Sequence, residues 1–363
     1  MVRLLPLELP SGKKILWKQV DAEKIEIFVD KNSARGGNAK PIVIKRFIEV
    51  NELLFEGFGL RFGDGSRIQG GKFNVFGYSN TEIEQLKNFL VFSRESLGIE
   101  PSNFNVKISL SPKDKSKIEE IKEKVSRELN IPFEKFWEPK IFDKRNLPFI
   151  DIKIQSTLLG MVVNSIFDEV KDILFSSKLF SACFLRGVIA GEANVNVRKE
   201  GRLGEISIAA EGEDRRNFLR RLLLNLGIQP NKDKTIEDQE AVCITGLSNF
   251  KIVKEWDLIK LSPNKKENFE KGMSGFKIEQ SRKGELRLKV LQLLSEKSRT
   301  RQELGKLLNR SPDTIKTEAL YVLERQGLVE REGIVNKARL WKITEKGLEI
   351  LKDKEALEKL RSR

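Results

Sequence analysis

Apolar residues recur at helical spacing in two long stretches and alternate with polar residues in several shorter ones. Leucines and phenylalanines follow a helical period over 82–97 and again over 215–226, which predicts amphipathic helices that back a sheet. Apolar runs at 105–110 and 241–245 predict strands, and each is followed by a further helical run. The chain is therefore expected to have a mixed α+β fold in which one order of elements occurs twice.

Shorter landmarks repeat along with these elements. Leu97-Gly98-Ile99 recurs as Leu226-Gly227-Ile228, at nearly the same offset that separates the other matching features. The helical runs that follow the two strands, 116–125 and 248–256, keep this order. An offset held over several landmarks indicates an internal duplication.

Two apolar stretches, 57–66 and 184–192, each carry a pair of glycines four residues apart: Gly59, Gly63, Gly187 and Gly191. Glycines at this spacing lie on one helical face and allow two helix backbones to approach closely. An acid follows the second glycine of each pair, Asp64 in the first and Glu192 in the second. The partial negative charge of a helix C-terminus disfavours a carboxylate, so two acids at matching helix ends predict a bound cation.

On these motifs the chain resembles the LAGLIDADG family, which includes homing endonucleases, intron maturases and WhiA-type regulators. The resemblance covers about residues 40–275 as two tandem repeats, each αββαββα-like with a saddle-shaped antiparallel sheet. It implies that the four glycines form the contact between the two motif helices, on a pseudo-twofold axis. It also implies that Asp64 and Glu192 are catalytic acids that bind Mg²⁺ or Mn²⁺ over the scissile phosphates of DNA.

The second motif departs from the family pattern at two positions. Ala190 stands where many members have another acid. Ala193 stands where a glycine normally ends the helix in a left-handed turn, a conformation that has a steric cost for alanine. This departure predicts a distorted geometry at the second helix end.

Composition and charge are consistent with a nucleic-acid partner. Lys and Arg number 67 against 53 Asp and Glu, a net charge of +14, which favours a polyanion. No apolar run reaches spanning length and no signal peptide opens the chain, so no membrane partner and a cytoplasmic location are expected. Abundant Lys and Glu with scarce Met and two apolar-flanked cysteines, Cys183 and Cys243, are typical of a thermophile protein with reduced thiols.

The chain contains no histidine. This excludes a Ser-His-Asp triad, a Cys-His pair, histidine-ligated zinc and the histidine-based nuclease motifs. Hydrolysis by carboxylates, a divalent metal and water remains compatible with the composition, because a metal lowers the pKa of bound water and screens the phosphate.

Strand alternation near the motifs predicts a groove-facing polar surface that would bind DNA. Polar and basic residues alternate with apolar ones after each motif, which places them on one face of a strand. Their side chains are of the types that contact base edges and phosphates: Arg67, Gln69, Lys72, Asn74, Asn194, Asn196 and Arg198. Lys107, on one strand face with Asn105 and Ser109, is expected to be a basic helper near the cleaved phosphate. The alternative is that these residues are the ordinary polar face of half-exposed strands.

A composition shift near 276–284 predicts a second module. Ser311 is a natural N-cap with Pro312 at the first helical position, and a strand-turn-strand follows through Gly333. This order resembles the winged helix of prokaryotic regulators. The resemblance implies that one helix lies in the major groove of DNA and contacts it through Ser311, Thr314, Lys316 and Thr317. It also implies that two residues of the wing, Lys337 and Arg339, contact phosphate or the minor groove. A winged helix used for protein contacts is the alternative.

The predicted organisation is an N-terminal extension over 1–50, a first repeat with its connection over 51–157, a second repeat over 158–276 and a winged helix over 280–363. Residues 139–154 are expected to form a proline-bearing connection between the repeats, which leads to a helix over 157–175. The predicted function is that of a freestanding, monomeric, site-specific double-strand DNA endonuclease. The alternatives are an inactive LAGLIDADG and winged-helix transcriptional regulator, or an intron maturase that binds structured RNA.

Overall fold

The computed structural model describes residues 14–30, 40–64, 75–142, 148–231, 234–236, 239–276, 284–335 and 338–353. The chain divides into two compact units after Gly275, with residues 246–248 grouped with the second. The first unit holds both glycine motifs, and its fold is mixed α+β with small sheets, as the sequence predicts.

The first unit opens with a three-stranded antiparallel sheet, β1 (Ile15–Gln19), β2 (Lys24–Val29) and β3 (Ile42–Lys45). Its buried face carries Ile25, Ile27 and Ile44, each no more than 5% exposed. Strand alternation therefore buries one face of this sheet, as a half-buried strand requires.

The first motif begins a set of elements built around the sheet β4-β7-β5-β6. Its elements are α1 (Glu52–Asp64), β4 (Phe76–Asn80), α2 (Ile83–Leu97), β5 (Asn105–Leu110), α3 (Ile118–Leu129), β6 (Lys140–Ile141) and β7 (Phe149–Ile154), with short 3₁₀ turns at Pro101–Asn103, Pro112–Lys117 and Phe133–Lys135. Helix α2 ends where Gly98 adopts a left-handed φ of 75°, a conformation that glycine reaches without strain.

The second motif begins a corresponding set around the sheet β10-β11-β9-β8. The elements from the connection onward are α4 (Thr157–Val170), α5 (Ile173–Ser176), α6 (Lys178–Glu192), β8 (Ala193–Val197), β9 (Leu203–Ala209), α7 (Glu213–Asn225), β10 (Lys234–Ile236), β11 (Gln239–Ile244), α8 (Leu247–Glu255) and α9 (Pro263–Ser274). Ser177 caps α6, since its hydroxyl accepts a hydrogen bond from the Phe180 amide at 3.3 Å.

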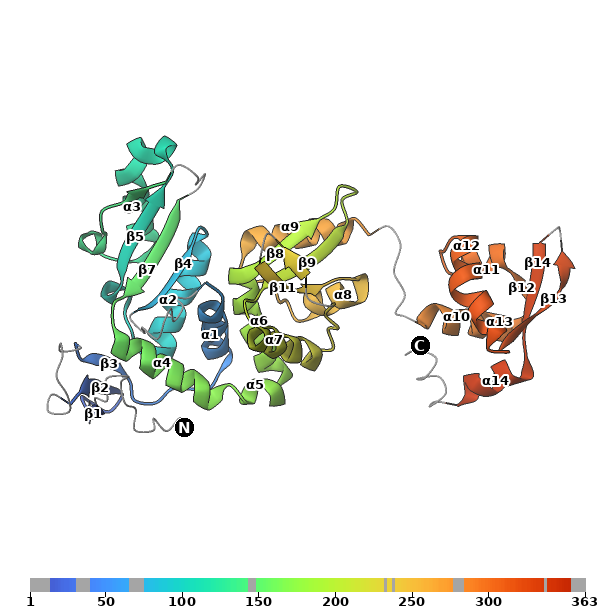
Figure 1. Cartoon of the computed structure of the whole chain (residues 1–363), viewed down its shortest axis with the longest axis horizontal. Coiled ribbons are helices and arrows are strands. Elements are labelled where there is room, and N and C mark those ends of the chain that lie inside the picture. Colours follow the sequence, from blue (N-terminus) through green and yellow to red (C-terminus); the bar gives the residue numbers. More distant parts are fainter. Residues whose placement is uncertain are drawn as a thin grey trace. The chain divides into compact units, whose positions relative to one another are not determined.

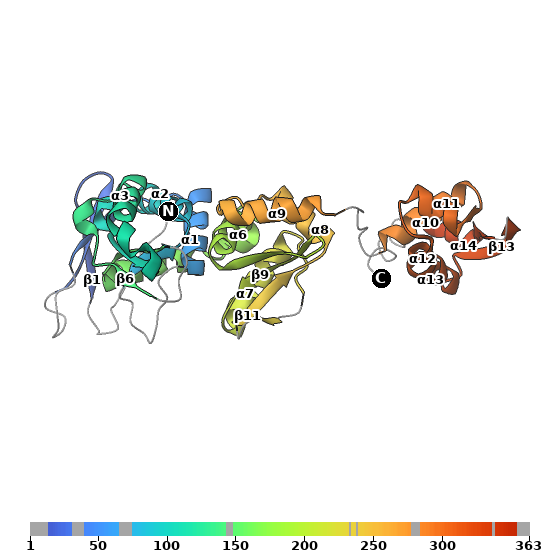
Figure 2. The same ribbon diagram turned by 90° about the horizontal axis from the view of Figure 1, so that it is seen from above.

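The two motif helices, α1 and α6, lie side by side between the two sheets (Figures 1 and 2). A cluster of phenylalanines packs beside this pair, including Phe62 against Phe184 at 5.4 Å between ring centroids and Phe62 against Phe218 at 5.7 Å. Phe218 belongs to α7, so aromatic packing joins α7 to both motif helices.

Two sequence predictions between the motifs are wrong. The segment Phe149–Ile154, expected to be part of a connection, is strand β7, and it lies between β4 and β5 in the sheet. Its residues alternate between apolar and polar, and Ile150 and Ile152 are buried. The helix predicted over 157–175 is interrupted after Val170. The sheet is antiparallel as expected between β4, β7 and β5, and the two residues of β6 pair with β5 in parallel at its edge.

The second unit has four helices, a short strand and a hairpin among its described residues. Its elements are α10 (Glu285–Glu296), β12 (Arg299–Thr300), α11 (Arg301–Leu307), α12 (Pro312–Thr314), a π-helical turn (Ile315–Leu320), α13 (Tyr321–Arg325), β13 (Val329–Val335), β14 (Ala338–Ile343) and α14 (Glu345–Lys352), the segments from α12 to α13 forming one continuous helix. The strands follow the order β12-β14-β13. Ser311 caps this continuous helix by accepting from the Thr314 amide at 3.1 Å, so the predicted N-cap is confirmed.

Candidate catalytic centre at the ends of two helices

The two motif helices contact each other through their glycines. A Cβ built on Gly59 would lie 3.0 Å from the Gly187 Cα, and one built on Gly63 would lie 3.4 Å from the Gly191 Cα. Both contact pairs advance in the same direction along the chain, so the helices run parallel. Their C-terminal ends therefore come together.

Glu192 lies at this joint end. Its Cγ is 3.4 Å from the position of a Cβ on Gly63, the residue that precedes Asp64. The Glu192 side chain is 12% exposed. Asp64 is the last residue of α1, and its side chain lies outside the described part of the structure. The structure thus brings Glu192 to the end of the helix that Asp64 terminates.

Arg215, near the start of α7, contacts the ends of both motif helices. Its Nη2 lies 3.4 Å from Glu192 Oε1 and donates a hydrogen bond to the carbonyl of Phe62 in α1. Its guanidinium also lies over the Phe62 ring, 4.1 Å from the centroid. Sequence reasoning missed this residue, because one arginine among several in an amphipathic helix carries no signal of its own.

Lys265, in α9, covers the end of α6. Its Nζ donates to the carbonyls of Ile189 at 3.0 Å and Gly191 at 3.1 Å, and to the carbonyl of Ala190. Carbonyls in the last turn of a helix lack intrahelical partners and carry partial negative charge, so a lysine there is stabilising. Nothing in the sequence around Lys265 indicates this contact.

The distortion predicted from Ala193 does not occur. Ala193 has φ −87° and ψ 147°, an extended conformation in which alanine has no steric cost. Helix α6 passes directly into strand β8 at this residue, so no left-handed residue is needed to end it.

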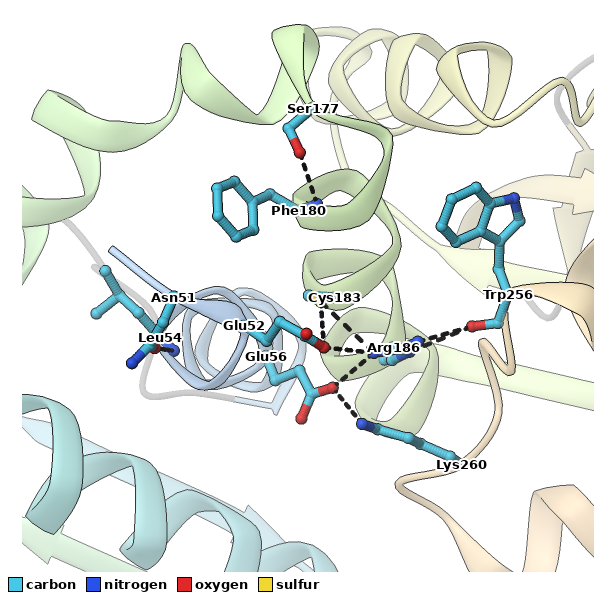
Figure 3. Close-up of polar contacts among 10 residues, drawn as sticks. All are labelled: Asn51, Glu52, Leu54, Glu56, Ser177, Phe180, Cys183, Arg186, Trp256 and Lys260. Atoms are coloured by element: carbon cyan, nitrogen blue, oxygen red, sulfur yellow. Dashed lines mark hydrogen bonds and ion pairs between the residues drawn. The ribbon is translucent and has the colours of Figure 1, made fainter. Parts of the chain in front are cut away.

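A second polar cluster lies further back along the same helix pair (Figure 3). Glu52 and Glu56 of α1 and Cys183 of α6 offer ligand atoms within 4.8 Å of one another, an arrangement compatible with a metal ion. Positively charged side chains already pair with both acids, however: Arg186 lies 3.0 Å from Glu56 and 3.6 Å from Glu52, and Lys260 lies 2.6 Å from Glu56.

The thiol in this cluster is also a poor metal ligand. Burial raises the pKa of Cys183 to about 12, which keeps the thiol protonated, whereas metals bind the thiolate. Arg186 also donates to the carbonyl of Trp256 at 3.0 Å (Figure 3). The cluster is therefore an ion-pair network that joins α1 and α6 to the segment after α8.

Lys107 lies on β5, on the polar face of the first sheet, opposite Asp151 of β7. Burial, followed by the nearby Lys140 and Lys153, lowers the pKa of Lys107 below its ordinary value. Asp151 pairs with Lys153 at 2.5 Å, and Lys153 lies 5.0 Å from the Trp137 ring centroid. The structure thus groups Lys107 with other lysines on this face, whereas Glu192 is grouped with Arg215.

The second sheet presents a polar face close to the helix ends. Asn194, Asn196 and Arg198 are exposed along and just after β8, which follows Glu192 directly. Asn194 and Asn196 lie opposite Ser207 and Glu205 of β9. The corresponding residues predicted after the first motif lie outside the described residues: Arg67, Gln69, Lys72 and Asn74.

The predicted contact residues of the second unit lie along one helix and one strand. Ser311 and Thr314 share a hydrogen bond of 2.8 Å, and the hydroxyl of Thr317 donates to the carbonyl of Asp313 at 2.9 Å. Lys316 lies 5.2 Å from the Tyr321 ring centroid. Arg339 is exposed on β14, and Lys337 lies outside the described residues.

Comparison with known proteins identifies part of the first unit. The sequence profile described as LAGLIDADG-like domain matches residues 180–255. No curated protein sequence matches the chain. None of the helices in the described residues is long and apolar enough to cross a membrane.

Several solved structures share a general likeness with the chain. Full-length DUF199/WhiA from Thermatoga maritima is 12% identical over 76% of this chain and 91% of that chain, with a TM-score of 0.38. The homing endonuclease I-DmoI, in its mesophilic variants, is 15% identical over 58% of this chain and 96% of that chain, with a TM-score of 0.28. I-DmoI in complex with DNA and Ca is 16% identical over 60% of this chain and 96% of that chain, with a TM-score of 0.30.

The profile match lies over α6, β8, β9, α7 and the elements up to α8. Residues 180–255 therefore form a LAGLIDADG-like domain, which confirms the resemblance read from the second motif. Glu192, Arg215 and the polar face of β8 all belong to this domain.

Proposed function

We propose that this chain, with its LAGLIDADG-like domain, is a divalent-metal-dependent endonuclease that cuts both strands of a long DNA site. The observation that carries the proposal is the position of Glu192, whose side chain lies against Gly63 at the end of α1. Parallel packing of α1 and α6 brings the last residues of both helices together, so Asp64 and Glu192 would act as a pair. Each acid would serve one DNA strand.

The donor chemistry suits a hard cation. Carboxylate oxygens are preferred ligands of Mg²⁺, and Lys265 already occupies the last backbone carbonyls of α6. Glu192 and Asp64 would therefore hold the ion by their side chains. A bound Mg²⁺ or Mn²⁺ would lower the pKa of a water molecule and neutralise charge on the phosphate.

The polar sheet faces would hold the DNA. Asn194, Asn196 and Arg198 would contact base edges and phosphates next to Glu192, and the lysine group around Lys107 would contact the backbone on the other repeat. Arg215 and Lys265 add positive charge at the helix ends, where phosphates would approach. The net charge of +14 supports binding of a polyanion.

The second unit would act as a winged helix that extends the DNA site. Its helix–helix–hairpin order and the sheet β12-β14-β13 support this assignment. The residues at the start of the continuous helix would enter the major groove, and Lys337 and Arg339 would contact phosphate or the minor groove.

One contact favours a second candidate, a DNA-binding regulator that does not cut. Arg215 lies 3.4 Å from Glu192, and a carboxylate held by a guanidinium is a weaker ligand for a divalent cation. In such a protein the acids would be structural, and the polar faces and second unit would supply DNA binding alone.

The test is cleavage of a randomised duplex library by the full chain in Mg²⁺ and in Mn²⁺, with sequencing of the new ends. We expect cuts at a defined long site, loss of cutting in Asp64→Asn and in Glu192→Gln, and retained duplex binding in both. Glu200→Gln is the matched control, since Glu200 is an exposed acid in the turn after β8. Binding without cleavage in either metal would establish the regulator instead, and preference for structured RNA would establish the maturase.

A further inference from the structure

We propose that Arg215 is a positioning residue that sets the cation affinity of Glu192 in the free protein, an inference that rests on the proposed function. Arg215 occupies the carboxylate that would hold the metal, and it comes from α7 rather than from either motif helix. Its role would be to neutralise Glu192 until a phosphate or a cation takes its place.

Contacts with both motif helices hold the guanidinium at this point in the described structure. Its Nη2 is shared between Glu192 of α6 and the carbonyl of Phe62 in α1, and its plane lies over the Phe62 ring at 4.1 Å. The Arg215 side chain is 18% exposed, so little water screens the pair. The residue therefore contacts the ends of both motif helices while it neutralises the acid of one.

The positive charge of Arg215 opposes the binding of a metal ion to Glu192. A divalent cation bound to Glu192 would lie a few ångströms from the fixed guanidinium, and like charges at that distance repel. Metal binding therefore requires Arg215 to turn away from Glu192. Phosphates attract arginine strongly and bidentately, so DNA at the helix ends would offer the guanidinium a new partner. Metal and DNA should then strengthen each other's binding, because such coupling is reciprocal.

Two substitutions of Arg215 separate the effect of its charge from the effect of its length. Arg215→Met removes the charge and keeps a long side chain, whereas Arg215→Lys keeps the charge. Arg221→Met is the matched control, because Arg221 lies on the same helix but its guanidinium carbon lies over the Phe175 ring, 3.9 Å from the centroid. Thermal unfolding of each variant shows whether the fold is retained.

The measurement is the affinity of the full chain for Mn²⁺, read from the electron paramagnetic resonance signal of the free ion. We expect Arg215→Met to bind Mn²⁺ roughly tenfold more tightly than the unaltered protein, and Arg215→Lys and Arg221→Met to bind as it does. In a Glu192→Gln background, Arg215→Met should have no such effect.

Equal Mn²⁺ affinity in Arg215→Met and the unaltered protein overturns the inference, as does a gain that persists in the Glu192→Gln background. If Glu192→Gln weakens Mn²⁺ binding while Arg215→Met changes nothing, only the role of Arg215 fails. If Glu192→Gln also leaves Mn²⁺ binding unchanged, the metal centre of the proposed function fails with it.

Discussion

Gly59 and Gly187 face each other across the contact between α1 and α6 with no room for a side chain. A Cβ on Gly187 would lie 2.6 Å from the Gly59 carbonyl carbon, and a Cβ on Gly59 would overlap the Phe184 carbonyl. The atoms in the way are backbone atoms, which cannot move without shifting a helix. The parallel pairing of α1 and α6 therefore depends on glycine at both positions.

Gly59→Ala should destabilise the first unit by about 3 kcal/mol, because the added methyl forces two packed helices apart. Urea unfolding of the full chain, followed by tryptophan fluorescence and circular dichroism, measures the loss. Gly333→Ala is the steric control, since no atom of the described residues other than its chain neighbours lies within 4 Å of the added Cβ, and its effect should stay within about 0.5 kcal/mol. Equal stability in both variants would show that the two helices do not approach this closely.

Lys265→Met should destabilise the first unit by about 2 kcal/mol, because the last carbonyls of α6 lose a charged donor. Lys265→Arg should recover part of the loss. Lys271→Met, on an exposed position of the same helix α9, should change stability by less than about 0.5 kcal/mol. Indistinguishable unfolding midpoints for Lys265→Met and Lys271→Met would rule out the capping role.

Glu56→Gln should cost about 3 kcal/mol, because Arg186 and Lys260 would lose the carboxylate between them, which is only 12% exposed. A double-mutant cycle with Arg186→Met isolates the pair, and we expect the two losses to be clearly less than additive. Glu119, whose side chain is 66% exposed where it pairs with Lys122, serves as the control, with Glu119→Gln costing less than about 0.5 kcal/mol. Additive losses would mean that the Glu56 and Arg186 side chains do not interact.

Cys183 should make the folded protein less stable at high pH. Burial raises its pKa from 9.0 to about 12, so the thiol's contribution is fully present below pH 9 and is lost as pH rises from 9 towards 12. The loss should be about 1.4 kcal/mol for each pH unit above 9, as the unfolded chain alone releases the proton. Between pH 8 and pH 10, the free energy of unfolding should therefore fall by about 1 kcal/mol more in the unaltered protein than in Cys183→Ala. The same pH dependence in both would contradict the raised pKa.

The sequence predicted the second motif and the helix contact because both depend on local spacing. Glycines four residues apart share a helical face wherever the helix packs, so Gly187 and Gly191 could be assigned to one contact surface from the sequence alone. The cap at Ser311 was predictable for the same reason, since an N-cap bonds to an amide three residues later. Strand β7 was missed because the proline-bearing run before it indicated a connection, although its own alternation is that of a strand.

By itself, the sequence determined that two glycine-bearing helices end in acids, that no histidine takes part and that the surface carries excess positive charge. Only the tertiary structure decided which positively charged side chains lie at those helix ends. Arg215 and Lys265 reach the helix ends from α7 and α9, and their contacts with Glu192 and the α6 carbonyls depend on how these helices pack. Such contacts leave no local period in a sequence, because they join residues whose spacing along the chain is unrelated to their distance in space.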